Sequence, residues 1–247
     1  MDTGPKIAQV AALVGDPTRA TMLAALLDGR ALTASELAYR AGVAPQTASG
    51  HLSKLRQAGL LAGERQGRHR YVRLASPQVA RMLERLMVVA EAMPVRAAPR
   101  WRGGEPLRRA RTCYDHMAGG LAVAIADRLT GCGHVVLDGD GGVVTESGHA
   151  VLTGLGLDLP TGARRPFCRP CLDWSERRPH LAGVVGAALL GHALDRGWVR
   201  RLRDSRALDV PPEGERALVV AFGLPAAAWA GPGPALRPAC DDARPVA

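Results

Sequence analysis

The chain has 247 residues and a net charge of +9, from 32 Lys and Arg against 23 Asp and Glu. This length suffices for one large or two small domains, and the longest apolar run, Leu181–Gly191, is too short to cross a bilayer. The positive charge is concentrated early: residues 1–111 carry 18 basic and 8 acidic side chains, whereas residues 112–247 carry 14 and 15. We therefore expect a polyanion to be the partner of the N-terminal part only.

The N-terminus lacks the pattern of a secretory signal peptide. A cytoplasmic location with no membrane partner is therefore expected. In that compartment the five cysteines are expected to be thiols and not disulfides.

Three short helices are predicted before residue 43. The first is Lys6–Val14, and Asp16–Pro17 has the cap and first-turn residues of the second. The third begins with Thr33, and Glu36 stands three residues later, which is the spacing of a capping box. Gly42 then suits the tight turn that joins two helices in a helix-turn-helix.

The next predicted helix, Pro45–Ala58, has two different faces. Its apolar residues Ala48, Leu52 and Leu55 recur at helical spacing and are expected to face a core. Its opposite face carries short polar side chains, which can approach base edges in a major groove. The residues of this helix expected to contact DNA are Gln46, Thr47, Ser49, Gly50, His51, Ser53 and Lys54.

A basic hairpin is predicted directly after this helix, with its turn at Gln66–Gly67. A hairpin in this position is a wing, and its basic side chains are placed to contact phosphates or a minor groove. The residues concerned are Arg65, Arg68, His69 and Arg70.

Ser76–Pro77 starts a further helix with a broad apolar side. The stripe through Leu83 and Leu86 is widened by Val89 and Met93. Either the core of the same chain covers this side, or a second copy of the chain does.

The run from Glu36 to Leu74 resembles the ArsR/SmtB family of bacterial winged-helix repressors, and the resemblance extends over residues 6–92. It implies a homodimer that binds a double-stranded DNA operator and leaves it when an inducer, often a metal ion, binds. The helix after Ser76–Pro77 corresponds to the family's dimer helix, so we favour a second copy over the core of the same chain as the cover of its apolar side. Some members have metal ligands on the recognition helix or the dimer helix, where this chain has no cysteine. The resemblance therefore implies a DNA-binding transcriptional regulator that is not an enzyme, with any metal site elsewhere.

The rest of the chain is predicted to contain an internal repeat. Residues 94–106 form a linker rich in Pro, Gly and Arg. Beyond it, His116-Met-Ala-Gly and His180-Leu-Ala-Gly each start a helix that a hairpin and a shorter helix follow. The expected fold is mostly α with small β wings: a winged helix-turn-helix in residues 1–93, a C-terminal pseudo-repeat helical domain in residues 107–224 and a disordered tail in residues 225–247.

Cysteine and histidine gather just before the two repeat helices. Pseudosymmetry would bring Cys113-x-x-His116 close to Cys168-x-x-Cys171 and His180. Such a soft ligand set suits Zn²⁺, Cd²⁺ or Pb²⁺, or As(III) if only thiolates bind. No cofactor is required, and the ion is expected as an inducer. The candidate ligands are Cys113, His116, Cys168, Cys171 and His180.

Other roles for these cysteines stay open, since a single Cys-x-x-Cys is a weak zinc signal. The thiols could sense oxidation, or they could be structural while a small organic ligand acts as the inducer. A thiol-disulfide enzyme using Cys168 and Cys171 is a remote alternative. That motif needs a preceding strand, and Gly162–Pro166 stands there instead.

Overall fold

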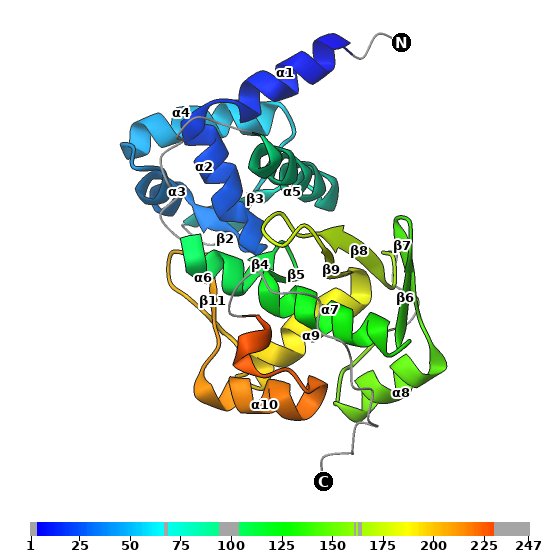
Figure 1. Ribbon diagram of the computed structural model, residues 1–247. Coiled ribbons are helices and arrows are strands. Elements are labelled where there is room, and N and C mark those ends of the chain that lie inside the picture. The colour runs from blue at the N-terminus through cyan, green and yellow to red at the C-terminus, as the bar shows by residue number, and fades with distance from the viewer. Residues whose placement is uncertain (1–3, 67–68, 94–103, 161, 163–164, 230–247) are drawn as a thin grey trace. The chain divides into compact units, whose positions relative to one another are not determined.

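The computed structural model describes residues 4–66, 69–93, 104–160, 162 and 165–229 (Figure 1). Contacts divide the chain into two compact units, Met1–Leu86 and Met87–Ala247. No single described helix is long and apolar enough to span a membrane. Lys6–Val14 and Pro17–Asp28 pass that test only as a pair, which is bent by 83°.

Unit 1 is a winged helix-turn-helix, as predicted. Asp16 accepts a hydrogen bond from the Arg19 amide, and Thr33 and Glu36 form the capping box. Strands pair in the order β1-β3-β2, which makes β2 and β3 the wing. Its elements are α1 Gly4–Val14, α2 Pro17–Ala25, η1 Leu26–Asp28, β1 Leu32–Thr33, α3 Ala34–Ala41, α4 Pro45–Gln57, β2 Leu61–Gln66, β3 His69–Leu74 and the first part of α5 Pro77–Ala92.

Unit 2 contains the same order of elements twice, hairpin, helix, hairpin and helix, which confirms the predicted repeat (Figure 1). The first copy is β4 Arg111–Cys113, β5 His116–Ala118, α7 Gly120–Gly131, β6 Val135–Asp138, β7 Gly141–Val144 and α8 Glu146–Gly154. The second copy is β8 Arg169–Leu172, β9 Pro179–Ala182, α9 Gly183–Asp195, β10 Arg200–Arg201, β11 Leu208–Asp209 and α10 Pro212–Phe222. Helix α6 Gly104–Arg109 precedes them and η2 Ala226–Ala228 follows.

The two copies share a steric requirement at the third residue of their second helix. A Cβ atom on Gly148 would lie 2.0 Å from the carbonyl oxygen of His134, and one on Gly214 would lie 2.0 Å from that of Trp198. Only a residue without a Cβ atom fits at these two positions, because α8 passes close to the backbone between α7 and β6, and α10 passes close to the backbone between α9 and β10. Both glycines lie within helices, Gly148 in α8 and Gly214 in α10.

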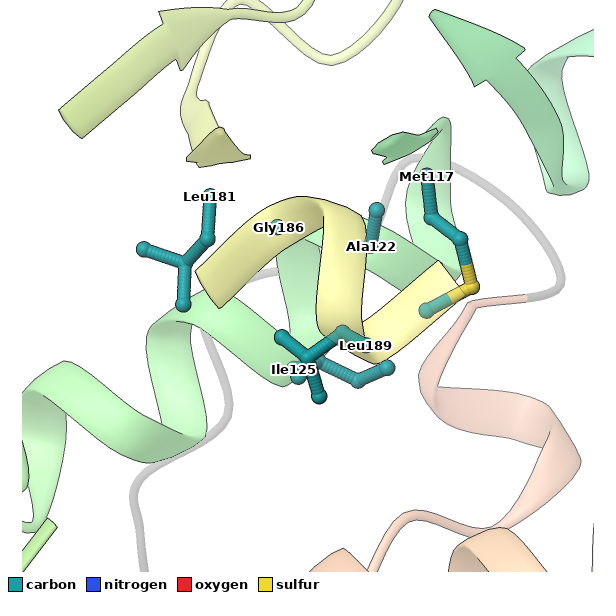
Figure 2. A pocket seen from close by; sticks show the side chains of 6 residues that line it. All are labelled: Met117, Ala122, Ile125, Leu181, Gly186 and Leu189. Atoms are coloured by element: carbon teal, nitrogen blue, oxygen red, sulfur yellow. The ribbon is translucent and has the colours of Figure 1, made fainter. Parts of the chain in front are cut away.

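The core of unit 2 is packed between α7 and α9 (Figure 2). A cavity of about 10 Å³ lies there, with room for no more than one water molecule. Figure 2 shows the side chains that line it. The packing is therefore close to complete where the two copies meet. The residues around the cavity are Met117, Ala122, Ile125, Leu181, Gly186 and Leu189.

Three boundaries in unit 2 differ from the sequence expectations. His116 and His180 lie on β5 and β9, so the repeat helices begin only after the second strand of each hairpin. Residues 104–106 of the expected linker belong to α6, and residues 94–103 lie outside the described part. The expected disordered tail starts with η2 and Trp229, which is 1% exposed in the core; residues 230–247 lie outside the described part.

Candidate functional site

Helix α4 presents an exposed polar face, and its apolar face is buried. Ala48, Leu52 and Leu55 are all at most 4% exposed, in agreement with the predicted stripe. The hydroxyl of Ser49 donates to the Pro45 carbonyl at 2.9 Å, so its oxygen is available mainly as an acceptor. The exposed residues of the face are Gln46, Thr47, Ser49, Gly50, Ser53 and Lys54.

His51 differs from these neighbours. Its side chain is only 18% exposed, and Nδ1 lies 3.7 Å from Oδ1 of Asp16, the residue that caps α2. The structure therefore places His51 against the start of another helix of unit 1 and not on the exposed face.

The wing places two arginines opposite each other. Arg65 on β2 and Arg70 on β3 are directly paired in the register, and both are exposed. Like charges in this position repel each other, so an anion between or beside them is favourable. Arg68 and the side chain of His69 lie outside the described part of the chain.

A second candidate site is buried in unit 2. Cys113, His116, Cys171 and His180 each offer one ligand atom, and these atoms all lie within 4.8 Å of one another. The two Sγ atoms are 3.9 Å apart, and the two imidazole centroids are 5.1 Å apart. All four residues are buried. The set of two thiols and two imidazoles is typical of tetrahedral zinc sites.

The two equivalent hairpins explain this meeting. Cys113 pairs with His116 across β4 and β5, and Cys171 pairs with His180 across β8 and β9. Directly paired residues project to the same face of a hairpin. Each hairpin therefore supplies one thiol and one imidazole.

Two carboxylates orient the imidazoles. His116 Nδ1 is 3.0 Å from Asp115 Oδ1, and His180 Nδ1 is 3.2 Å from Asp173 Oδ2. The second contact has the distance of an ion pair but does not have hydrogen-bond geometry. The Nε2 atoms of both histidines are buried with no hydrogen-bond partner among the described residues. A buried acceptor without a partner is costly, so a cation that accepts electron pairs fits these two atoms.

The electrostatics of the cluster favour a thiolate beside a protonated imidazole, and a bound cation would displace that proton. The hydrogen bond from Cys113 holds the pKa of the Cys171 thiol well below its usual range, although burial opposes this. Burial lowers the pKa of His180, but the facing Cys171 and Asp173 side chains raise it to about 9. Burial also raises the pKa of Asp173, but the contact with His180 and the charge of Arg111 hold it well below its usual value. The surroundings therefore favour the thiolate form of Cys171.

Cys168 is not part of this cluster, contrary to the sequence analysis. It is 3% exposed in the core of unit 2, where its backbone bridges Gly142. Cys171 lies three residues further along an extended segment, and residues at odd separation in such a segment face opposite sides. Burial raises the pKa of the Cys168 thiol to about 11, so it is a packing residue.

This arrangement also excludes a thioredoxin-like motif, because Cys171 lies within strand β8 and no helix begins there. Cys113, Cys168 and Cys171 are free, as expected, whereas Cys132 is disulfide-bonded, contrary to the expectation. Cys240 lies outside the described residues.

The sequence analysis missed the residues around the four ligands. Arg111-x-Cys113-x-Asp115 and Arg169-x-Cys171-x-Asp173 form a repeated motif, with an offset of 58 residues. The histidines repeat with an offset of 64, since six residues separate Asp173 from His180 and none separates Asp115 from His116. A search at one offset therefore finds only half of the motif.

Comparisons with known proteins agree with the fold of unit 1. A family model for a helix-turn-helix domain matches residues 14–64. The chain is 40% identical over 215 residues to "Uncharacterized HTH-type transcriptional regulator YdfF" of Bacillus subtilis, which covers 86% of this chain and 95% of that protein. It is 37% identical over 87 residues to the HTH-type transcriptional regulator CmtR of Mycobacterium tuberculosis, which covers 35% of this chain and 73% of CmtR.

Solved structures that match unit 1 include two mycobacterial proteins. The cadmium metal-sensor CMTR of Mycobacterium tuberculosis is 35% identical with a TM-score of 0.31, over 38% of this chain and 99% of that one. The homodimeric winged helix-turn-helix domain of Mb0332 from Mycobacterium bovis is 27% identical with a TM-score of 0.34. That match covers 39% of this chain and 92% of the Mb0332 domain. The protein has a winged helix-turn-helix DNA-binding domain like that of the ArsR family and is not an enzyme. Since the YdfF match covers 86% of this chain and 95% of that protein, the chain belongs to the HTH-type transcriptional regulators.

Proposed function

We propose that the protein is a homodimeric repressor that places α4 of each subunit in successive major grooves of a near-palindromic operator. The observation that carries this proposal is the exposed polar face of α4 next to a wing with exposed arginines. Gln46, Thr47 and Ser49 are the candidates for base contacts, because they lie in the first turns of the helix. Arg65 and Arg70 are the candidates for phosphate contacts.

The dimer is proposed to form through α5. Leu86, Val89 and Met93 are 45%, 56% and 58% exposed, and their spacing puts them along one side of the helix and its end. An exposed apolar stripe of this kind is typical of a surface that a partner covers. The Mb0332 domain is described as homodimeric, which supports the same assembly here.

The inducer is proposed to be a soft metal ion that binds the Cys/His cluster of unit 2. CmtR is described as a cadmium sensor, and the four clustered ligands suit such an ion. DNA release requires that the ion bind the DNA-free state more tightly than the DNA-bound state.

Contacts within unit 2 connect the cluster to α5. Arg206 donates to the Thr112 carbonyl, next to Cys113 in the chain, and also to the sulfur of Met87 on α5. Arg177, in the β8–β9 hairpin, donates to the Glu91 carbonyl at 3.0 Å. Since α5 continues into the winged helix-turn-helix, a shift of either hairpin can change the dimer helix.

Thiol oxidation is a second candidate signal, favoured by the 3.9 Å separation of the Cys113 and Cys171 sulfurs. A disulfide requires about 2.05 Å between sulfurs, so oxidation would draw the two hairpins together. A small organic ligand has a different candidate place, a pocket of about 480 Å³ near the ends of α8, α9 and α10, with Arg196 and Arg216 in its lining.

DNA binding is tested by fluorescence anisotropy of the reduced protein on its own upstream DNA and on a scrambled duplex. Gln46→Ala is expected to reduce the preference for the native sequence by about 1–3 kcal/mol. Arg70→Ala is expected to weaken both complexes alike and to reduce the slope of log K against log salt by about 0.9 for each lost phosphate contact. If Gln46→Ala leaves the preference unchanged, Gln46 has no role in base recognition; if no DNA is preferred, the repressor proposal is wrong.

A further inference from the structure

We propose that Cys113, His116, Cys171 and His180 bind a single tetrahedral divalent cation of the zinc class, Zn²⁺ or Cd²⁺, which joins the two copies of the repeat. This inference rests on the proposed metal-responsive function for its biological meaning. It goes further by naming the class of ion and the part of the fold that the ion connects.

The separation of the ligand atoms fits such an ion. A zinc ion has sulfur ligands at about 2.3 Å and nitrogen ligands at about 2.0 Å, so the ligand atoms of a tetrahedral site lie roughly 3.3–3.8 Å apart. The sulfurs of Cys113 and Cys171 are already 3.9 Å apart, and no pair in the cluster exceeds 4.8 Å. A small contraction completes the tetrahedron.

Charge selects a divalent ion. Two thiolates and one divalent cation are neutral together, which matters because all four ligands are buried. The nearby carboxylates are already balanced: Asp173 pairs with Arg111 at 2.9 Å, and Asp115 pairs with Arg165 at 2.7 Å. A monovalent ion would leave a buried net charge in this site.

The number of thiols favours Zn²⁺ or Cd²⁺ over As(III). A site of three thiolates for As(III) would need Cys168 as the third sulfur. Cys168 lies in the hydrophobic core of unit 2 and is absent from the cluster. The two remaining thiols with two imidazoles form the S₂N₂ set that zinc and cadmium accept.

The histidines are already oriented for an ion. Asp115 and Asp173 face the Nδ1 atoms at 3.0 and 3.2 Å, so the Nε2 atoms are the ones available for coordination. A carboxylate behind a ligating imidazole fixes its tautomer and raises its basicity. Both Nε2 atoms are buried without a hydrogen-bond partner among the described residues, as is Nδ1 of His180, which has only its ion-pair contact with Asp173.

Neither copy of the repeat can form the site alone. Each contributes one cysteine and one histidine from one hairpin, so a bound ion necessarily joins β4–β5 to β8–β9. All four positions would be protein ligands, which is typical of closed sites that stabilise a fold. Binding of the ion and docking of the two hairpins are therefore linked.

The test is a titration of the reduced, metal-free full chain with Co²⁺, which reports its geometry by visible absorption. We expect one equivalent to bind with the intense bands of a tetrahedral thiolate site, and Zn²⁺ or Cd²⁺ to displace it. Cys168→Ser is the matched control and should bind like the native protein, whereas Cys171→Ser should lose the thiolate bands. Arsenite should compete less effectively than Zn²⁺ or Cd²⁺, because a third thiolate is missing.

Asp115→Asn keeps all four ligands and tests the site if Cys171→Ser fails to fold by circular dichroism. It should weaken Co²⁺ binding by about 10- to 100-fold. An octahedral spectrum, no binding, or loss of binding in Cys168→Ser would overturn the proposal. DNA anisotropy measured in parallel separates the tetrahedral site from the inducer role. Ion binding without DNA release would contradict only the inducer role. DNA release by the ion without a tetrahedral spectrum would contradict only the tetrahedral site.

Discussion

Arg111 of the first repeat forms a fully buried ion pair with Asp173 of the second, with Nη2 and Oδ2 2.9 Å apart. Asp173 also accepts a hydrogen bond from the Gly119 amide at 2.7 Å. One carboxylate therefore joins the two copies and contacts His180, a candidate ligand. The same group that orients an imidazole also holds the two hairpins together.

Removing this carboxylate should destabilise unit 2 strongly. Asp173→Ala leaves the Arg111 charge buried without its partner, which typically costs about 3–5 kcal/mol. The measurement is urea unfolding of the metal-free protein, monitored by circular dichroism. Asp158→Ala, at an exposed position, is the control and should change the unfolding free energy by less than about 0.5 kcal/mol. Equal effects of the two substitutions would contradict a structural role for the pair.

Two glycines of α9 should respond in opposite directions to the same substitution. A Cβ atom on Gly186 would lie 2.3 Å from the Leu181 carbonyl oxygen and 3.1 Å from Cβ of His116. Gly186→Ala should therefore lower the unfolding temperature, as overpacking typically costs about 1–3 kcal/mol. A Cβ atom on Gly191 meets nothing within 4 Å, so Gly191→Ala should stabilise α9 by about 0.5–1 kcal/mol. If Gly186→Ala is stabilising, the close contacts of the start of α9 with β9 and β5 are wrong.

The stability of the protein should depend on the Cys168 thiol at alkaline pH. Burial raises its pKa from 9.0 to about 11, so the folded state keeps a proton that the unfolded state loses. The contribution is fully present below pH 9 and is lost as pH rises towards 11, by about 2–3 kcal/mol in total. Unfolding free energies of the native protein and of Cys168→Ala should therefore converge between these pH values. A constant difference would show that the thiol titrates alike in both states.

The connection to α5 should be separable from metal binding. Arg177 has φ +55°, so Arg177→Gly removes the side chain that donates to Glu91 and leaves the backbone relaxed. Ion affinity should be unchanged, while the ion's effect on DNA affinity should fall by about 0.5–2 kcal/mol. The readout is DNA anisotropy with and without Cd²⁺, and Arg203→Ala is the control for loss of an exposed charge. An undiminished effect in Arg177→Gly would exclude this contact from the coupling.

Local signals in the sequence predict unit 1 well. Caps, a tight turn and one apolar stripe predict the helices α2, α3 and α4, because each of these signals is set by neighbours in the chain. The short elements η1 and β1 were not predicted. His51 is the exception: nothing local indicates that Asp16, from another helix, contacts it. The sequence left both DNA contact and packing open for His51, and the structure shows a packed side chain that is 18% exposed.

The internal repeat of unit 2 could be predicted from the sequence, but only four of the five predicted metal ligands lie in the cluster. The two His-x-Ala-Gly segments indicate the duplication, but six extra residues in the second hairpin hide the matching Arg-x-Cys-x-Asp motifs. Cys168 was misplaced because Cys-x-x-Cys spacing brings two thiols together in a turn and separates them in an extended segment. The local conformation, which the spacing does not determine, decided between the two.

The most direct test of the account measures DNA affinity by anisotropy as Cd²⁺ is added to three reduced proteins: native, Cys171→Ser and Cys168→Ser. The account predicts that Cd²⁺ weakens DNA binding of the native protein and of Cys168→Ser but not of Cys171→Ser, while all three bind DNA equally without metal. Equal responses of Cys171→Ser and the native protein would contradict the claim that the buried Cys/His cluster controls DNA binding. So would native binding that Cd²⁺ leaves unchanged.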